Sequence, residues 1–342
     1  MGSQRRKSRK RKRYGPAVLL LALLALGGWG AWCFLAPYGP QAEVFVEIQP
    51  GSSVLRIGQQ LESAGVVRNQ FVFDVLRWIR RGRLLAGEYR FDHPAAVTEV
   101  YDRIARGDVY TKAVMVPEGA TVFDIAERLE QAGFGPKESF LEAQARDTSL
   151  VADLDPEARS LEGYLFPDTY RFPRKATADH ICETMVRRFR QKAALAGLKE
   201  HVHDVVTMAS LVEKETAVGP ERPLVASVFA NRLAHHMPLM TDPSVIYGLE
   251  LEGQWRGAIY QSDLKRDTPY NTYLHAGLPP GPIANPGLRS LQAAMHPAKT
   301  DYLYFVAAGD DPQGHSVFSA TLEQHAHDVA AYRSAMRKAG AR

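Results

Sequence analysis

The chain has 342 residues, of which 45% are hydrophobic and 23% charged, so it can bury a sizeable core and is longer than one average domain. Its formal net charge of +4 is misleading, because eight lysines and arginines within the first thirteen residues leave about −4 for the remainder. A nucleic-acid-binding surface is therefore not expected outside this basic run, and no nucleic acid is predicted as a partner.

A long uncharged segment follows the basic run. Twenty consecutive uncharged, mostly apolar residues extend from Ala17 to Ala36, enough for a helix that crosses a hydrocarbon core of about 30 Å. Trp29 and Trp32 lie near its C-terminal end, where an aromatic belt is typical of a membrane interface. We interpret the segment as an uncleaved single-pass anchor rather than a signal peptide. Residues 1–15 are then a basic tail and 16–37 the anchor.

The anchor and the cysteines also indicate a location. The positive-inside rule places the basic tail in the cytoplasm and the rest of the chain outside it. Cys33 lies within the predicted anchor, so Cys182 is alone in the exported part and no disulfide framework is available. A large exported region without disulfides is typical of a bacterial envelope protein, here on the inner (plasma) membrane.

A repeated unit occurs twice after the anchor. The segment from Ile48 to Gly65 aligns without gaps with the segment from Val116 to Gly133, at an offset of 68 residues. Each copy is typical of a strand, a turn at Pro and Gly, a Ser or Thr cap, an amphipathic helix and a glycine stop. The unit resembles the opening of LysM-type glycan-binding modules, and a scaffold unit without a ligand is the alternative. We predict residues 38–150 as a LysM-like region with an internal repeat.

From about residue 151 helical segments alternate with loops rich in Pro, Gly, Asn and Tyr. Amphipathic helices are predicted at about 178–195 and 221–233. Loops of this composition often carry function. The chain as a whole is predicted to have an α+β fold, with one N-terminal transmembrane helix, a LysM-like β/α subdomain and a mixed α+β domain at 151–342.

Two glutamates lie near the end of the helix-like stretch VVTMASLVEKETA. Glu213 and Glu215 lie about 160° apart on a helix, so they cannot face the same cleft. Glu215 has Leu211, Val212 and Val218 as helical neighbours. Because desolvation disfavours an ionised carboxylate, we predict that Glu215 has a raised pKa and can act as a general acid. A structural salt bridge is the alternative for this carboxyl.

Several other motifs accompany this helix in a fixed order. LEGYLFPDTY precedes it, and VFANRL, TDPSVIYGL, YNTY, GLPPGPIANPG and HPAKTDYLYFV follow it. With the anchor and the LysM-like unit, this order closely resembles the membrane-bound endolytic murein transglycosylases, from the anchor to the last helix. The resemblance implies a lytic transglycosylase, a lyase acting on peptidoglycan, with residues 151–342 as its catalytic domain.

The resemblance also implies roles for individual residues. Glu215, the second glutamate of EKET, matches the catalytic acid, and Glu162 and Asp242 match polar positions expected to line the cleft. Asn285 stands where the family often has Thr, and the GDDPQGHSVF loop is longer than the family's minimal form, which affects the expected sugar contacts more than the chemistry. No cofactor or metal is implied. The remaining residues expected to bind substrate, each with a structural role as the alternative, are Tyr270, Asn271, Tyr273 and His315.

The implied reaction requires one protein carboxyl. The protonated acid cleaves the bond between N-acetylmuramic acid and N-acetylglucosamine, and the muramoyl C6 hydroxyl then attacks C1 to leave a 1,6-anhydro end. Because the second nucleophile belongs to the substrate, no water-activating carboxylate is needed. The implied partners are peptidoglycan strands, the membrane and penicillin-binding synthases, beside which nascent strands would be terminated.

Other functions fit the sequence less well. Ser210 and Lys214 are four residues apart, whereas the serine motif of penicillin-binding proteins needs S-x-x-K. His201, His203, His235 and His236 lack a matching carboxylate pattern, so we interpret them as solvated rather than metal ligands. The alternative from another class is a non-catalytic, membrane-anchored peptidoglycan-binding scaffold for cell-wall synthases.

Overall fold

A computed structural model describes residues 15–309 and 314–340, so the basic run at positions 5–13 lies outside the described residues. The first element, α1 (Gly15–Leu35), contains no charged residue. Its segment Val18–Leu35 is long and apolar enough to cross a membrane, and a signal sequence near an N-terminus has the same properties. The uncleaved anchor therefore stays a prediction.

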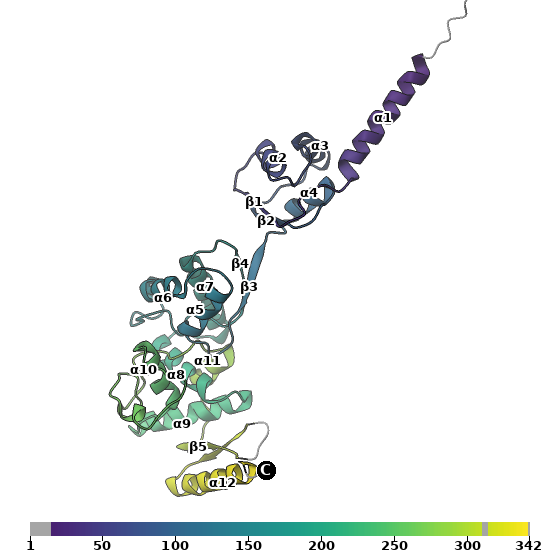
Figure 1. The fold of residues 1–342 in the computed structure, drawn as a ribbon. Coiled ribbons are helices and arrows are strands. Elements are labelled where there is room, and N and C mark those ends of the chain that lie inside the picture. Colours follow the sequence, from purple (N-terminus) through teal and green to yellow (C-terminus); the bar gives the residue numbers. More distant parts are fainter. Residues whose placement is uncertain (1–14, 310–313, 341–342) are drawn as a thin grey trace, which may run out of the picture. The chain divides into compact units, whose positions relative to one another are not determined.

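The chain divides into two units, residues 1–111 and 112–342. In the first unit a two-stranded antiparallel sheet is covered by short helices (Figure 1). Val46 pairs with Tyr89 in the sheet register, and both side chains are buried together with Leu61, Phe73 and Tyr101. The elements of this unit after α1 are β1 (Val44–Ile48), α2 (Val54–Ser63), α3 (Gln70–Arg80), β2 (Gly87–Phe91) and α4 (Val97–Arg106).

The two copies of the sequence repeat share one local structure but lie in different units. Helix α5 (Val122–Gln131) is offset by 68 residues from α2, as the alignment requires. Ser53 and Thr121 cap the two helices with their side-chain oxygens. Gly65 and Gly133 follow them with φ of 67° and 74°, a left-handed conformation that glycine adopts without strain. The region 38–150 thus contains parts of both units.

The second unit is mainly helical. Strand β3 is hydrogen-bonded to β4, and β5 pairs antiparallel with β6. The remaining elements are β3 (Thr111–Met115), α6 (Lys137–Arg146), β4 (Thr169–Pro173), α7 (Ala178–Ala196), α8 (Val202–Glu215), α9 (Arg222–Ala234), α10 (Asp242–Leu251), α11 (Leu288–Met295), β5 (Tyr304–Ala307), β6 (Ser316–Ser319) and α12 (Leu322–Gly340).

Helix α8 joins two buried clusters in this unit. Val206 belongs to the cluster that α5, α6 and α7 surround, whereas Leu211 and Val212 belong to a second cluster with Phe229 of α9. Helix α8 also packs against α10 and α11, so its C-terminal end is held from several sides. The predicted α+β class with a single N-terminal apolar helix is confirmed.

Candidate active site

The candidate site lies at the C-terminal end of α8. The helix ends at Glu215, because the backbone of Thr216 is extended, with φ −141° and ψ 130°. The Glu215 carboxyl is therefore at the negative end of the helix dipole, which disfavours a further negative charge. This position favours a carboxyl that keeps its proton.

Glu213, two residues earlier, is engaged in structural contacts. Its Oε1 lies 2.6 Å from Arg222 Nη2, and its Oε2 accepts a 2.9 Å hydrogen bond from the N–H of Gly287. The side chains of Glu213 and Arg222 are only 4% and 7% exposed, so breaking this pair would leave an uncompensated buried charge. These contacts of Glu213 tie α8 to α9 and to the start of α11.

Glu215 forms no ion pair with the described residues and keeps partial access to solvent. Burial raises its pKa to about 7, and the negative charge of Asp242 adds to the rise. The hydroxyl of Thr241 and the cation of Arg232 act in the opposite direction and lower the pKa. Glu215 therefore keeps its proton at a higher pH than an ordinary glutamate, which is almost fully ionised at pH 7.

Two loops bring polar groups to Glu215. Asp242 is the first residue of α10 and accepts a 2.6 Å hydrogen bond from the hydroxyl of Tyr273, which comes from the YNTY loop. Thr241 Oγ1 is buried and has no hydrogen-bond partner of standard geometry among the described residues. Its hydroxyl is thus free to turn toward Glu215 or toward a bound ligand.

Arg232 of α9 places a cation in the same neighbourhood. Its Nε donates to the carbonyl of Leu303 at 2.7 Å and its Nη1 to the carbonyl of Leu239 at 2.8 Å. The guanidinium also lies over the ring of Tyr304, 5.4 Å from its centre. Sequence reasoning missed Arg232 and Thr241 as site residues, although the VFANRL and TDPS motifs contain them.

Glu162 lies in a separate, closed group of residues. It is 1% exposed, and its carboxyl accepts hydrogen bonds from the N–H of Val122 at 2.9 Å and from the Asn285 amide at 2.7 Å. Burial raises the pKa of Glu162 to about 8. Tyr247 is buried beside Glu162, and its ring centre lies 5.1 Å from that of the half-buried Tyr270. Burial raises the pKa of both tyrosines, and the Glu162 charge adds to each rise. Glu162 thus fastens the start of α5 to the loop before α11.

The last two predicted contact residues differ in their surroundings. Asn271 is fully buried, and its amide nitrogen donates to the carbonyls of Leu264 and Arg266 within its own loop. His315 is half-buried and directly precedes β6. The next N–H, that of Ser316, donates to Glu221 at 2.8 Å, in the turn that follows α8. Asn271 therefore holds the loop in shape, whereas His315 is attached near the end of α8.

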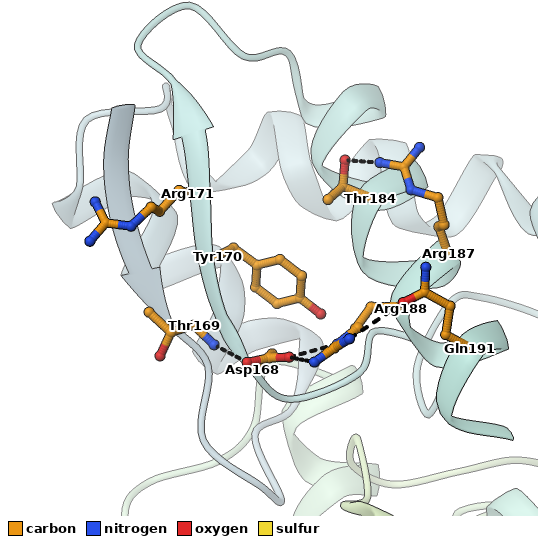
Figure 2. Close-up of a pocket in the computed structure, with 8 residues that line it drawn as sticks. All are labelled: Asp168, Thr169, Tyr170, Arg171, Thr184, Arg187, Arg188 and Gln191. Carbon is orange, nitrogen blue, oxygen red and sulfur yellow. Dashed lines mark hydrogen bonds and ion pairs between the residues drawn. The ribbon is translucent and has the colours of Figure 1, made fainter. Parts of the chain in front are cut away.

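A cavity of about 360 Å³ between β4 and α7 contains none of the predicted site residues. Figure 2 shows that Arg188 pairs with Asp168 inside it and that Arg171 points away from the ring of Tyr170. The Arg188–Asp168 pair has an N–O distance of 2.7 Å. Arg187 contacts the hydroxyl of Thr184. The cationic groups of this cavity do not converge on one point, so we place the candidate site at Glu215.

The fold and the site define a class of protein. It is an α+β protein with an N-terminal apolar helix and, at the end of α8, a protonatable carboxyl that forms no ion pair with the described residues, as general acid catalysis requires.

Comparison with known proteins gives the family. The YceG-like family model matches residues 46–331, and the chain belongs to this family. The chain is 34% identical to the endolytic murein transglycosylase of Bacillus subtilis, over 82% of each chain. It is 31% identical to the endolytic murein transglycosylase of Streptococcus pneumoniae, over 92% of this chain and 64% of that protein.

A solved structure agrees with these relatives. The crystal structure of a YceG-like protein from Listeria monocytogenes matches with a TM-score of 0.54 and 34% identity, over 84% of this chain and 99% of that chain. The family resemblance inferred from the sequence motifs is confirmed.

Proposed function

We propose that this protein is an endolytic peptidoglycan lytic transglycosylase that leaves 1,6-anhydro-muramoyl ends. The observation that carries the proposal is Glu215, an unpaired carboxyl with a pKa raised to about 7, in a chain whose relatives are named endolytic murein transglycosylases. A general acid must hold its proton near the working pH, and a carboxyl with this pKa satisfies that condition.

In the proposed reaction Glu215 acts first as an acid and then as a base. It donates its proton to the oxygen that links C1 of N-acetylmuramic acid to N-acetylglucosamine, and the C1–O bond breaks as an oxocarbenium-like centre develops. The Glu215 carboxylate then removes the proton of the muramoyl C6 hydroxyl, whose oxygen bonds to C1. No water is consumed, and the proton returns to Glu215.

The surroundings of Glu215 support this use of one carboxyl. A glycosidase that hydrolyses its substrate needs a second carboxylate as base or nucleophile. Glu162 is enclosed with two hydrogen-bond donors and is unsuited to that role. Asp242 lies beside Glu215 and favours its protonated form. We assign glycan contacts to Asp242, Tyr270, Tyr273 and His315, and positions that support the site walls to Glu162 and Asn271.

The proposed location follows from α1. We propose that α1 is a membrane anchor, with the N-terminus in the cytoplasm and the second unit outside the plasma membrane. An enzyme held at the outer face of the plasma membrane meets new glycan strands where synthases make them. We therefore propose that it terminates nascent strands beside penicillin-binding synthases, and that the LysM-like unit contacts glycan.

Mass spectrometry of sacculus digests tests the proposal. The purified protein is expected to create 1,6-anhydro-muramoyl ends inside glycan strands, and the Glu215→Gln variant is expected to create none. The matched control is Glu142→Gln, which changes an exposed carboxyl on α6 and should leave the products unchanged. If Glu215→Gln forms anhydro ends at the wild-type rate, the proposed acid is wrong. If neither protein forms them, the non-catalytic scaffold becomes the better reading.

A further inference from the structure

Helix α3 in the first unit carries an exposed apolar face in addition to its buried one. Phe73 and Leu76 point into the core. Phe71, Val75 and Trp78 are 65%, 47% and 73% exposed, and Ile79 beside them is 60% exposed. Positions 71, 75, 78 and 79 lie on one side of a helix, within about two turns. A helix with apolar residues on both sides is expected to have a second contact surface.

Basic residues follow the apolar face at the C-terminal end of α3. Arg81 and Arg83 are exposed and form no ion pair with the described residues, and Arg80 pairs with Asp102. A surface that combines Trp and Phe with arginines at its edge is typical of a helix lying in the interface of a bilayer, where arginines meet lipid phosphates.

The side chain of a residue just before α3 contacts the end of α1. The Arg68 guanidinium, two residues before α3, lies 4.0 Å from the ring centre of Trp32 in the last turn of α1 and 4.9 Å from that of Tyr38. Phe34 packs against the core of the same unit, and α1 contacts α4. If α1 spans the membrane, α3 begins within one side-chain length of the interface that Trp32 marks.

We propose that the exposed face of α3, defined by Phe71, Val75, Trp78 and Ile79, lies on the outer surface of the plasma membrane. The four apolar side chains enter the headgroup region, and Arg81 and Arg83 contact anionic lipid phosphates. This second contact would fix the orientation of the first unit relative to the membrane. The inference rests on the proposed anchoring by α1. A protein partner is the competing occupant, and the charge of the arginines together with the adjacency to α1 favours lipid.

A fluorescent label on the full chain in lipid vesicles tests the contact. Both native cysteines are replaced (Cys33→Ala, Cys182→Ala), and Ile79→Cys carries a polarity-sensitive fluorescent label. The vesicles contain lipids with a nitroxide quencher near the headgroup, and they are prepared with or without phosphatidylglycerol. We expect these lipids to lower the emission by at least about twofold, and more so with phosphatidylglycerol, since the face combines apolar and cationic groups. The same label at Asp108→Cys, an exposed position in the same unit, should not be quenched.

Further variants decide between the outcomes. Phe71→Ser with Trp78→Ser should abolish quenching at position 79 without changing the circular dichroism, because neither side chain belongs to the core. Arg81→Gln with Arg83→Gln should remove only the part that depends on phosphatidylglycerol. If water-soluble iodide quenches the label, the face of α3 is free in solution. If the label is shielded from iodide but insensitive to nitroxide lipids, a protein covers the face. Either result overturns the proposal. A separate Cys182→Ala protein, labelled at its native Cys33, reports whether α1 itself enters the membrane. Failed anchoring is thereby distinguished from failed docking of α3.

Discussion

Replacing Glu215 by Gln should stabilise the protein at alkaline pH while removing its proposed acid. Burial raises the pKa of Glu215 from the ordinary 4.5 to about 7, so the folded state binds this proton more tightly than the unfolded state does. Between these two pH values the native protein holds more protons than the unfolded chain, and stability therefore falls as pH rises.

The size of the effect follows from the shift. A rise of the pKa from 4.5 to about 7 corresponds to about 3 kcal/mol of lost stability once the pH exceeds the folded-state pKa. Glutamine is neutral at every pH and has nearly the same shape. The free energy of unfolding of Glu215→Gln should thus match wild type near pH 4 and exceed it by up to about 3 kcal/mol at pH 8.

Urea unfolding of the full chain in detergent at pH 4, 6 and 8 measures this difference. Glu213→Gln is the matched control, because it lies on the same helix but removes the buried partner of Arg222. It should destabilise the protein at pH 6 and 8 by about 3 kcal/mol. A stability gap between Glu215→Gln and wild type that does not grow with pH would refute the raised pKa. Equal destabilisation by both variants would show that Glu215 is also a structural carboxylate.

Three further substitutions test neighbouring groups. Asp242→Asn removes a charge that raises the pKa of Glu215, so the alkaline limb of the pH–rate profile should move to lower pH. Glu162→Ala leaves the N–H of Val122 and the amide of Asn285 without their acceptor, which should lower the urea-unfolding free energy at pH 6 by about 1–3 kcal/mol. Gly163→Ala should lower the thermal midpoint markedly, because Gly163 has φ of 87° and an added Cβ would lie 2.6 Å from Pro282. The expectations would be contradicted by an unchanged pH–rate profile for the Asp242 variant, an unchanged unfolding free energy for the Glu162 variant, or an unchanged thermal midpoint for the Gly163 variant.

Local patterns were readable from the sequence, whereas contacts between distant residues were not. Helical spacing alone separated Glu213 from Glu215, and the cap and glycine pattern located α2 and α5. The Glu213–Arg222 pair joins two helices, and the approach of Arg232 to Glu215 depends on how α9 packs against α8. The helical neighbours Leu211 and Val212 gave the right direction for the Glu215 pKa, whereas Val218 lies beyond the end of the helix. The polar groups that adjust this pKa come from α9 and from the start of α10.

The arrangement of the arginines explains how Glu215 stays unpaired on a helix beside two cations. Arg222 is buried against Glu213, and moving it to Glu215 would leave the Glu213 carboxylate without its partner. Arg232 donates from its Nε and Nη1 to two backbone carbonyls, so only part of its guanidinium group remains to pair with a carboxylate. Its charge lowers the pKa of Glu215 less than burial raises it. The fold thus accepts a destabilised carboxylate at Glu215, which is expected where a proton must be both held and released.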